Sequence, residues 1–296
     1  MRNNILGHTF VITANILYGI NYVIAKGIMP DHLSPRAIIF IRVAGALAFF
    51  WLFHSIFIKE KVARKDLLKL AFCAIFGVAI NQIMFFEGLN KTTEINTSII
   101  MTINPIMVLI FSYFLLKEKI TIFKIFGIML GGAGAVYLIL SQGNLSLSSD
   151  TFVGNLFIIV NASSFALYLV LVKPLMSKYN PLTIMKWIFL FGFIYVFPFS
   201  IGEVVQYDLT VIPTDIWLLI AYVIVGTTIL GYLLYNFALQ KISATTTSFY
   251  IYLQPLLASM TVILLGRDNL THVEIISAIL IFAGVFMVSR KSTNSL

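Results

Sequence analysis

Charged residues and cysteine are both scarce in this sequence, and each scarcity excludes a class of protein. Asp, Glu, Lys and Arg make up 11% of the chain and hydrophobic residues 59%, against about 25% and about 45–50% in soluble domains. A soluble core cannot bury so much apolar surface, so an ordinary soluble protein is excluded. Cys73 is the only cysteine, which rules out a disulfide within the chain and predicts a small packing residue in an apolar block.

Long polar segments and catalytic motifs are missing too. The longest polar connections, about 141–153 and 202–215, are too short to form an aqueous domain. No His-Glu-x-x-His motif occurs, and the glycine-rich run at 127–134 lacks the Lys-Ser/Thr ending of a phosphate loop. The net charge of +8 comes from basic residues between apolar blocks, where membrane orientation accounts for it. The sequence therefore predicts no enzyme, cofactor, metal site or nucleic-acid partner.

The sequence does contain a series of apolar blocks, each long enough for one transmembrane helix. A bilayer core roughly 30 Å thick needs about 17–25 such residues per helix. The first block lacks a cleavage site of small residues, so we interpret it as a retained helix rather than a signal peptide. We predict an all-α integral protein of the cell membrane with ten transmembrane helices, at 9–29, 36–58, 67–88, 95–116, 122–140, 154–175, 183–201, 216–239, 245–265 and 273–289.

The basic residues predict the orientation. If the N-terminus is cytoplasmic, fifteen Lys and Arg residues fall in cytoplasmic segments, and only Arg36, Lys91 and Arg267 fall outside. Lys26 and Arg42 remain, within or at the edge of spans. Because cytoplasmic loops carry the excess of Lys and Arg in membrane proteins, we predict that both termini are cytoplasmic.

The two halves of the sequence repeat each other. Residues 89–138 align with residues 239–288 without a gap, and Lys26 matches Lys173 at a slightly shorter offset. Each half would hold five helices, an odd number, so the second half must cross the membrane in the opposite sense. We place the halves at 1–141 and 154–296, joined by an extracytoplasmic linker at 142–153.

A proline lies near the middle of one span in each half, at Pro105 and Pro255. Proline has no backbone N–H, so the carbonyls of Met101 and Ile251 lose their helical partners. Paired helix breaks in inverted repeats point to the substrate site of secondary transporters. The alternative is that the prolines only bend two packed helices; we favour a site lined by both broken helices.

The run Gly88-LNKTTEINTSIIMTINPIMVLIFSYFLLKEKIT, followed by glycines in the next span, resembles the signature of EamA-domain members of the drug/metabolite transporter superfamily. Tyr18-Gly-Ile-Asn-Tyr-Val-Ile-Ala-Lys26 is similar to the first-helix motif of that family. The resemblance covers both halves and implies ten helices and transport of small solutes, often export. The chain departs from the pattern in two places: Leu265-Gly-Arg-Asp stands where Leu-Gly-Glu is usual, which leaves Asp268 as the acid, and Glu87 ends the third helix.

Polar side chains form stripes at helical spacing within four spans. Such stripes face protein or water rather than lipid, and hydrogen bonds between helices are the alternative to a shared cavity. Together with the prolines, they predict a substrate site lined by Asn15, Tyr18, Tyr22, Lys26, Ser98, Thr102, Pro105, Asn161, Ser164, Tyr168, Ser248, Tyr252 and Pro255.

Three ionisable residues lie in or near predicted spans. Arg42, one or two turns inside the second helix, is expected to bind a substrate carboxylate, to pair with Glu87, or to reach the outer headgroups. Lys26 is expected either to contact the substrate or to reach the headgroups. Glu87 is the candidate for proton coupling, since burial raises the pKa of a carboxyl and lets it bind and release a proton.

We therefore predict a secondary transporter, an exporter, that moves a small, amino-acid-like organic metabolite by alternating access. Its partners are the small-molecule substrate and the lipid bilayer, and a homodimer is allowed. An intramembrane enzyme acting on a lipid or peptide is a second hypothesis, but it needs a nucleophile–base or metal group that the sequence does not supply. A membrane scaffold or sensor is a third, weakened by the lack of an aqueous output domain.

Overall fold

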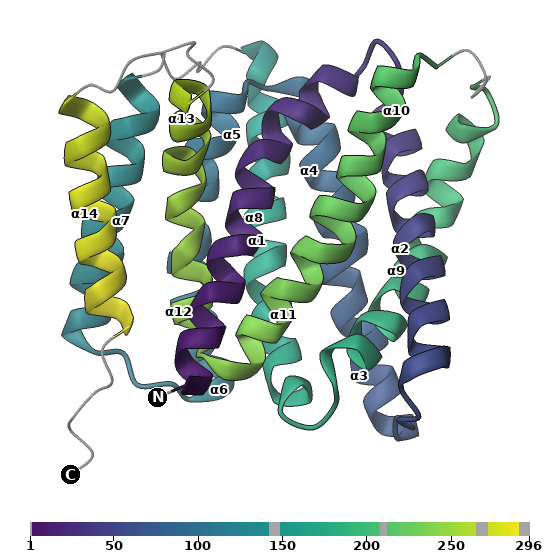
Figure 1. The fold of residues 1–296 in the computed structure, drawn as a ribbon, viewed down its shortest axis with the longest axis horizontal. Coiled ribbons are helices and arrows are strands. Elements are labelled where there is room, and N and C mark those ends of the chain that lie inside the picture. The colour runs from purple at the N-terminus through teal and green to yellow at the C-terminus, as the bar shows by residue number, and fades with distance from the viewer. Residues whose placement is uncertain (1, 142–148, 208–211, 265–271, 290–296) are drawn as a thin grey trace.

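The computed structural model describes residues 2–141, 149–207, 212–264 and 272–289. Helices account for nearly all of this part of the chain (Figure 1). The first half holds α1 (Arg2–Ile28), α2 (Pro35–Phe57), α3 (Arg64–Ala74), the π-helical segment η1 (Ile75–Ala79), α4 (Ile80–Lys91), α5 (Glu94–Met101), α6 (Asn104–Leu116) and α7 (Ile122–Ser141).

The second half repeats this order. It holds α8 (Ser149–Met176), α9 (Pro181–Val204), α10 (Thr214–Ala221), the π-helical segment η3 (Tyr222–Gly231), α11 (Tyr232–Lys241), α12 (Ala244–Phe249), the 3₁₀ turn η4 (Tyr250–Tyr252), α13 (Leu253–Leu264) and α14 (His272–Ser289). Helix α8 begins within the range predicted for the linker, 142–153. Residues 142–148 of that range lie outside the described part of the chain. Residues 265–268, where the sequence departs from the family pattern, also lie outside it.

Nine helical segments of the described chain are long and apolar enough to cross a bilayer. They match nine of the ten predicted spans, and α3, η1 and α4 form one of them. The remaining prediction, 245–265, corresponds to α12, η4 and α13, which the 3₁₀ turn divides, and its last residue lies outside the described part. Large apolar side chains such as Phe114, Phe126 and Phe286 are exposed on the outside of this helical body. These exposed apolar side chains indicate a surface that contacts lipid, because exposing so much apolar surface to water is unfavourable.

The helices of the two halves interlock. The pairs α7–α14 and α2–α9 each join equivalent helices, while α4 packs on α8 in the same way that α11 packs on α1. Figure 1 shows α1 and α8 running in opposite vertical directions, as do the broken pairs α5–α6 and α12–α13. This exchange of partners fits two repeated halves that run in opposite directions.

Both prolines stand at breaks. Helix α5 ends at Met101 and α6 begins at Asn104, directly before Pro105. In the second half, α12 ends at Phe249, the turn η4 follows, and α13 begins at Leu253, two residues before Pro255. The predicted pair of broken helices is confirmed, because a ring nitrogen without a hydrogen cannot continue the helical bonding.

Glycine sets how closely α7 and α14 approach. A Cβ on Gly284 would lie 2.6 Å from the carbonyl oxygen of Gly127, and a Cβ on Gly127 would lie 2.6 Å from a Val288 methyl. Any larger side chain would push these helices apart. The small-residue face of α7 therefore lets the two helices pack closely.

Lys26, on α1, caps the C-terminal end of the third span of the first half. Its Nζ donates to the carbonyl of Leu89 at 2.8 Å and to that of Thr92 at 3.1 Å, just where α4 finishes. The last carbonyls of a helix lack partners within the helix, and a lysine ammonium can satisfy them. The structure thus gives Lys26 a capping position, neither in contact with the central cavity described below nor directed to headgroups.

Lys173 repeats this arrangement in the second half. Its Nζ donates to the carbonyl of Leu239 and, at 2.7 Å, to that of Ile242, at the end of α11. These two carbonyls stand in the same relation to Lys173 as the α4 carbonyls do to Lys26. The same chemistry therefore closes equivalent helices at opposite ends of the molecule.

Candidate functional site

A polar cavity lies where α1, α2, α4, α8, α11 and the broken helices meet. Its empty volume is about 570 Å³, which includes space that opens to solvent. The cavity is lined by Tyr18, Asn21, Tyr22, Arg42, Asn81, Gln82, Phe85, Met101, Asn161, Phe165, Tyr232, Tyr235, Ile251 and Gln254.

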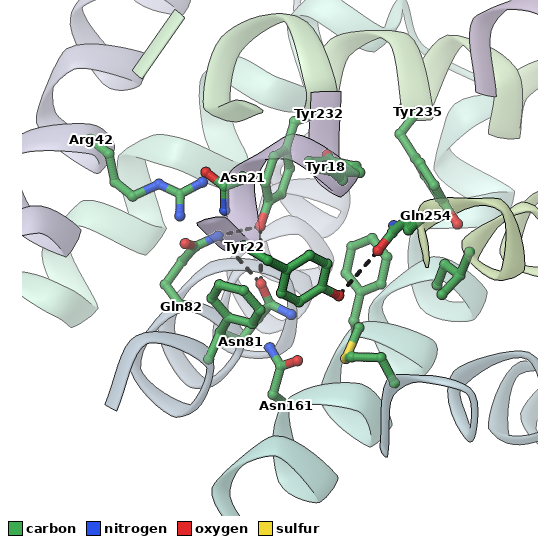
Figure 2. A pocket seen from close by; sticks show the side chains of 14 residues that line it. Tyr18, Asn21, Tyr22, Arg42, Asn81, Gln82, Asn161, Tyr232, Tyr235 and Gln254 are labelled. Carbon is green, nitrogen blue, oxygen red and sulfur yellow. Dashed lines mark hydrogen bonds between the residues drawn. The ribbon is translucent and has the colours of Figure 1, made fainter. Parts of the chain in front are cut away.

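Among the described residues, Arg42 is the only charged one on this lining. Its side chain is buried, with the residue 4% exposed, and its Nε donates to Thr228 Oγ1 at 2.8 Å. The guanidinium also lies over the Phe86 ring, 4.8 Å from the centroid. No acid of the described residues lies within ion-pair distance of it, so the cation is neutralised neither by a carboxylate nor by solvent. Figure 2 shows Arg42 directed toward Asn21 and Gln82.

These contacts correct two of the three predictions for Arg42. Pairing with Glu87 is wrong, because Glu87 Oε1 instead accepts from Arg36 Nε at 2.8 Å. Arg36 lies at the N-terminal end of α2 and Arg42 about 9 Å further along the helix, at about 1.5 Å per residue. Reaching the headgroups is also wrong, because the Arg42 side chain is enclosed within the protein.

Amides and tyrosines of the lining form a hydrogen-bond network. Gln82 Nε2 donates to the Tyr232 hydroxyl and, at 3.3 Å, to Asn81 Oδ1. The Tyr232 hydroxyl lies 3.0 Å from the Gly77 carbonyl and 3.1 Å from Asn81 Oδ1, so it can donate to either (Figure 2). This network joins the third span of the first half to its equivalent in the second half.

Gln254 is held from both sides by α1. Its Nε2 donates to Asn15 Oδ1 at 2.8 Å, and its Oε1 accepts from the Tyr22 hydroxyl at 3.1 Å. Asn15 is not on the lining, but it fixes a residue that is. Gln254 precedes Pro255 on the broken helix, so α1 holds that helix at the cavity.

Three buried polar atoms of the lining have no hydrogen-bond partner among the described residues: Tyr18 Oη, Asn21 Oδ1 and Asn161 Oδ1. Asn161 Nδ2 donates to the Asn81 carbonyl at 2.8 Å, which leaves its oxygen free. A buried polar atom without a partner costs about 1–3 kcal/mol. Polar groups of a solute can supply the missing bonds.

Of the predicted site residues, Tyr18, Tyr22, Arg42 and Asn161 line the cavity. The freed carbonyls were predicted at Met101 and Ile251, and these two residues line it as well. The remaining members lie elsewhere, each in a position that packing explains.

Several of them make bonds within or between helices. Ser164 Oγ donates to the Phe76 carbonyl of η1 at 2.7 Å, and Tyr168 Oη donates to Asn236 Oδ1 at 2.9 Å. Thr102 Oγ1 and Ser248 Oγ donate to carbonyls of their own helices.

The last four members come from the broken helices. The Tyr252 hydroxyl donates to the Thr102 carbonyl at 3.1 Å, which ties the two broken helices together. Ser98 and Pro255 are partly buried and Pro105 is buried, all off the lining. These stripes therefore lie mostly between helices rather than on the cavity.

Sequence reasoning missed eight lining residues: Asn21, Asn81, Gln82, Phe85, Phe165, Tyr232, Tyr235 and Gln254. Asn81, Gln82 and Gln254 are amides inside apolar spans, and that contrast was a usable signal. Tyr232 and Tyr235 gave none, because tyrosines in spans also occur in plain helix contacts.

Polar contacts close one end of the α2–α9 pair. Ser34, the N-cap of α2, donates to Glu203 near the end of α9. Arg36 joins this group through two ion pairs: its Nε lies 2.8 Å from Glu87 Oε1, and its Nη1 lies 3.3 Å from Glu203 Oε1. We call Ser34, Arg36, Glu87 and Glu203 the outer latch, after the side on which the predicted orientation places them.

Another group closes the opposite end. Asn180, the N-cap of α9, donates its backbone N–H to Glu60 Oε2 at 3.0 Å, just after α2 ends. Asp66, with a side chain 3% exposed, accepts from Lys178 and from the Tyr179 hydroxyl at 2.8 Å. The contact with Asp66 raises the pKa of Lys178 above its ordinary value. We call Glu60, Asp66, Lys178, Tyr179 and Asn180 the inner latch.

The fold and the cavity together define a class: a multi-pass protein of the cell membrane, made of two repeated halves around a polar cavity. The chain belongs to the EamA-like transporter family, whose model matches residues 5–140 and 152–290. Both halves are therefore members of one family.

The relatives carry transporter names. The uncharacterized transporter YyaM of Bacillus subtilis (strain 168) is 27% identical over 234 residues, 78% of this chain and 76% of its own. An uncharacterized transporter of Archaeoglobus fulgidus is 27% identical over 263 residues, 88% of this chain and 89% of its own. The WAT1-related protein At4g30420 of Arabidopsis thaliana is 27% identical over 201 residues, 57% of this chain and 53% of its own.

A solved crystal structure has the same fold. It superposes with a TM-score of 0.75 over 97% of both chains, at 14% sequence identity. At that identity the likeness establishes the fold alone. The family and the relatives make this chain a membrane transporter.

Proposed function

We propose that the protein is a secondary transporter, an exporter, that carries a small amino-acid-like metabolite through the Arg42 cavity by alternating access. The observation that carries the proposal is a buried cation on the lining with no carboxylate partner among the described residues. A buried charge without a partner is costly. A substrate carboxylate would neutralise it, and the planar guanidinium suits bidentate binding.

The other lining groups favour a substrate that also donates hydrogen bonds. Asn21 Oδ1 and Asn161 Oδ1 are unpaired acceptors, and the faces of tyrosine rings attract cations. An amino acid offers a carboxylate for Arg42 and an ammonium group for these acceptors. Phe85, Phe165, Met101 and Ile251 supply an apolar wall for a side chain.

The two latches support alternating access. Each ties the start of one helix of the α2–α9 pair to the end of the other, at opposite ends of the molecule. Opening one latch while the other stays closed would expose the cavity to one side at a time. Protonation of Glu87 would remove its ion pair with Arg36, so proton coupling through this residue would act on the outer latch.

The orientation is part of the proposal. Both termini would be cytoplasmic, with the halves at 1–141 and 154–296 and an extracytoplasmic linker between them. Reporter fusions after Gly143 and Gly202 test this orientation. Both should give extracytoplasmic signal, and cytoplasmic signal from either would contradict it.

The function is tested by counterflow in proteoliposomes with pooled, labelled amino acids and other organic acids. The wild-type protein should exchange at least one carboxylate-bearing solute. Replacement of Arg42 by Gln should weaken this exchange, because losing a charge-assisted contact costs on the order of 1.5–3 kcal/mol, roughly 10- to 100-fold in affinity. Lys61→Gln, at an exposed loop position, is the matched control. A fully active Arg42→Gln protein would rule out the proposed anchor.

An intramembrane enzyme remains the rival hypothesis, and the described residues give it little support. They contain no group of three His, Cys, Asp or Glu side chains able to hold a metal ion. The same proteoliposomes separate the hypotheses: a transporter returns the labelled solute unchanged, whereas an enzyme changes its chemistry.

A further inference from the structure

An apolar groove runs along the lipid-facing side of α2 and α9, away from the cavity. Its empty volume is about 790 Å³, and it is lined by Ala44, Leu47, Ala48, Trp51, Leu52, Ser55, Leu190 and Phe193. From Ala44 to Ser55 the groove follows α2 for eleven residues, roughly 16 Å at about 1.5 Å per residue. That length is close to one leaflet of a hydrocarbon core about 30 Å thick.

A cation lies at one end of this groove. Lys186 is one helical turn before Leu190 on α9, and its Nζ lies 4.3 Å from the centroid of the Trp51 ring. It also lies 5.5 Å from the Trp187 ring and 3.2 Å from His54 Nδ1, to which the ammonium donates. These contacts hold the ammonium beside the groove and use only one of its three hydrogen atoms.

Lys186 has no acidic partner among the described residues. Glu60, the acid that follows α2, accepts from the Asn180 backbone instead. The cation lies near the first turns of α9 and the last turns of α2, the end that carries the inner latch. Tryptophans mark the depth where hydrocarbon meets headgroups. The Trp51 and Trp187 rings, with centroids 5.7 Å apart, therefore place Lys186 at headgroup depth.

We propose that this groove binds one anionic phospholipid, with the phosphate at Lys186 and an acyl chain along α2. The apolar lining takes the chain, and the unpaired ammonium complements the negative headgroup. Basic positions between transmembrane helices on the cytoplasmic side suit such headgroups, since anionic lipids are enriched in that leaflet. A zwitterionic phospholipid has the same acyl chains but no net negative charge. The groove should therefore bind the anionic lipid more tightly, because only that lipid's net charge is complemented by Lys186.

The tryptophans provide the test. Trp51, Trp187 and Trp217 are the only tryptophans of the chain, and Trp217→Phe leaves the two beside the groove as the sole reporters. This variant is placed in nanodiscs of phosphatidylcholine with one tenth brominated phosphatidylglycerol, and in nanodiscs with one tenth brominated phosphatidylcholine instead. A bound anionic lipid should make quenching by the brominated phosphatidylglycerol severalfold stronger.

Lys186→Gln in the same background should bring the two quenching values together, whereas Lys61→Gln, on an exposed loop at the same end, should preserve the difference. Equal quenching in the Trp217→Phe protein itself would overturn the proposal without any lysine variant. So would an equal loss of preference in both lysine variants, which would indicate general attraction to a basic surface. Weak quenching by both lipids, with a dimeric mass, would mean that a second copy of the chain covers the groove.

Discussion

The two halves of the molecule share their supports and differ in their cavity chemistry. Lys26 and Lys173 close equivalent helices, and π-helical segments interrupt the third span of each half at matching positions. On the lining, by contrast, Gln82 faces its own equivalent, Tyr232, and the position that matches Arg42 at the offset of Lys26 and Lys173 holds the apolar Phe189. Duplicated residues therefore hold the scaffold, and under the proposed function the residues that differ would determine which solute fits.

The largest effect should follow from breaking a shared support. Lys26→Met or Lys173→Met leaves two helix-end carbonyls without their charged donor, each bond being worth about 1.5–3 kcal/mol. Both variants should lower the unfolding temperature in detergent by similar amounts and reduce abundance. Fluorescence-detected size-exclusion chromatography after a heating series measures this, with Lys61→Met as the control. A large loss for one lysine and none for the other would contradict the equivalence of the halves.

A smaller, more specific effect should follow from changing the unshared cation. Arg42→Lys keeps the charge but loses the planar fork, so substrate affinity should fall roughly tenfold while thermal stability stays near wild type. Replacing Phe189, at the corresponding place in α9, by Leu should instead lower stability, because Phe189 is fully buried against Phe50 and Tyr232. Counterflow and unfolding curves on both proteins separate the two roles. If Arg42→Lys and Phe189→Leu changed counterflow and stability to the same extent, the distinction between a substrate-binding and a structural role would be contradicted.

The smallest effect should come from the amide–tyrosine link between the halves. Tyr232→Phe removes one hydroxyl from a network in which Gln82 and Asn81 still bond each other. We expect a loss of about 0.5–1.5 kcal/mol in stability and a modest change in the apparent KM for counterflow. Tyr137→Phe, at a partly exposed position off the cavity, is the matched control. A Tyr232→Phe protein with no measurable transport would assign this hydroxyl to substrate binding.

Much of the scaffold could be predicted from the sequence because it depends on local chemistry. The proline breaks, the glycine face of α7 and the apolar spans each follow from the residues at those positions. The position of Lys26 was harder to predict. A lysine near a helix end can snorkel, bind a solute or cap a neighbour, and only packing decides which.

The cavity could be predicted only in part because its residues meet through tertiary packing. The polar stripe of α8 illustrates this: Asn161 reaches the lining, whereas Ser164 and Tyr168 bond other helices. Helical periodicity predicts which residues share a face but not which neighbour that face meets. The pairing of Glu87 with Arg36 rather than Arg42 depended on depth, a difference of nearly two turns along α2.

The central claim is that the cavity opens to one side at a time, and cysteine accessibility tests it most directly. Cys73→Ala removes the only thiol, and Met101→Cys places one on the cavity lining. A membrane-impermeant thiol reagent is then applied to right-side-out and inside-out vesicles. We predict labelling from both sides. Glu203→Ala in the outer latch should raise labelling from outside and lower it from inside, and Glu60→Ala in the inner latch should do the reverse. Labelling from one side only in all three proteins, or a rise on both sides together, would contradict the account.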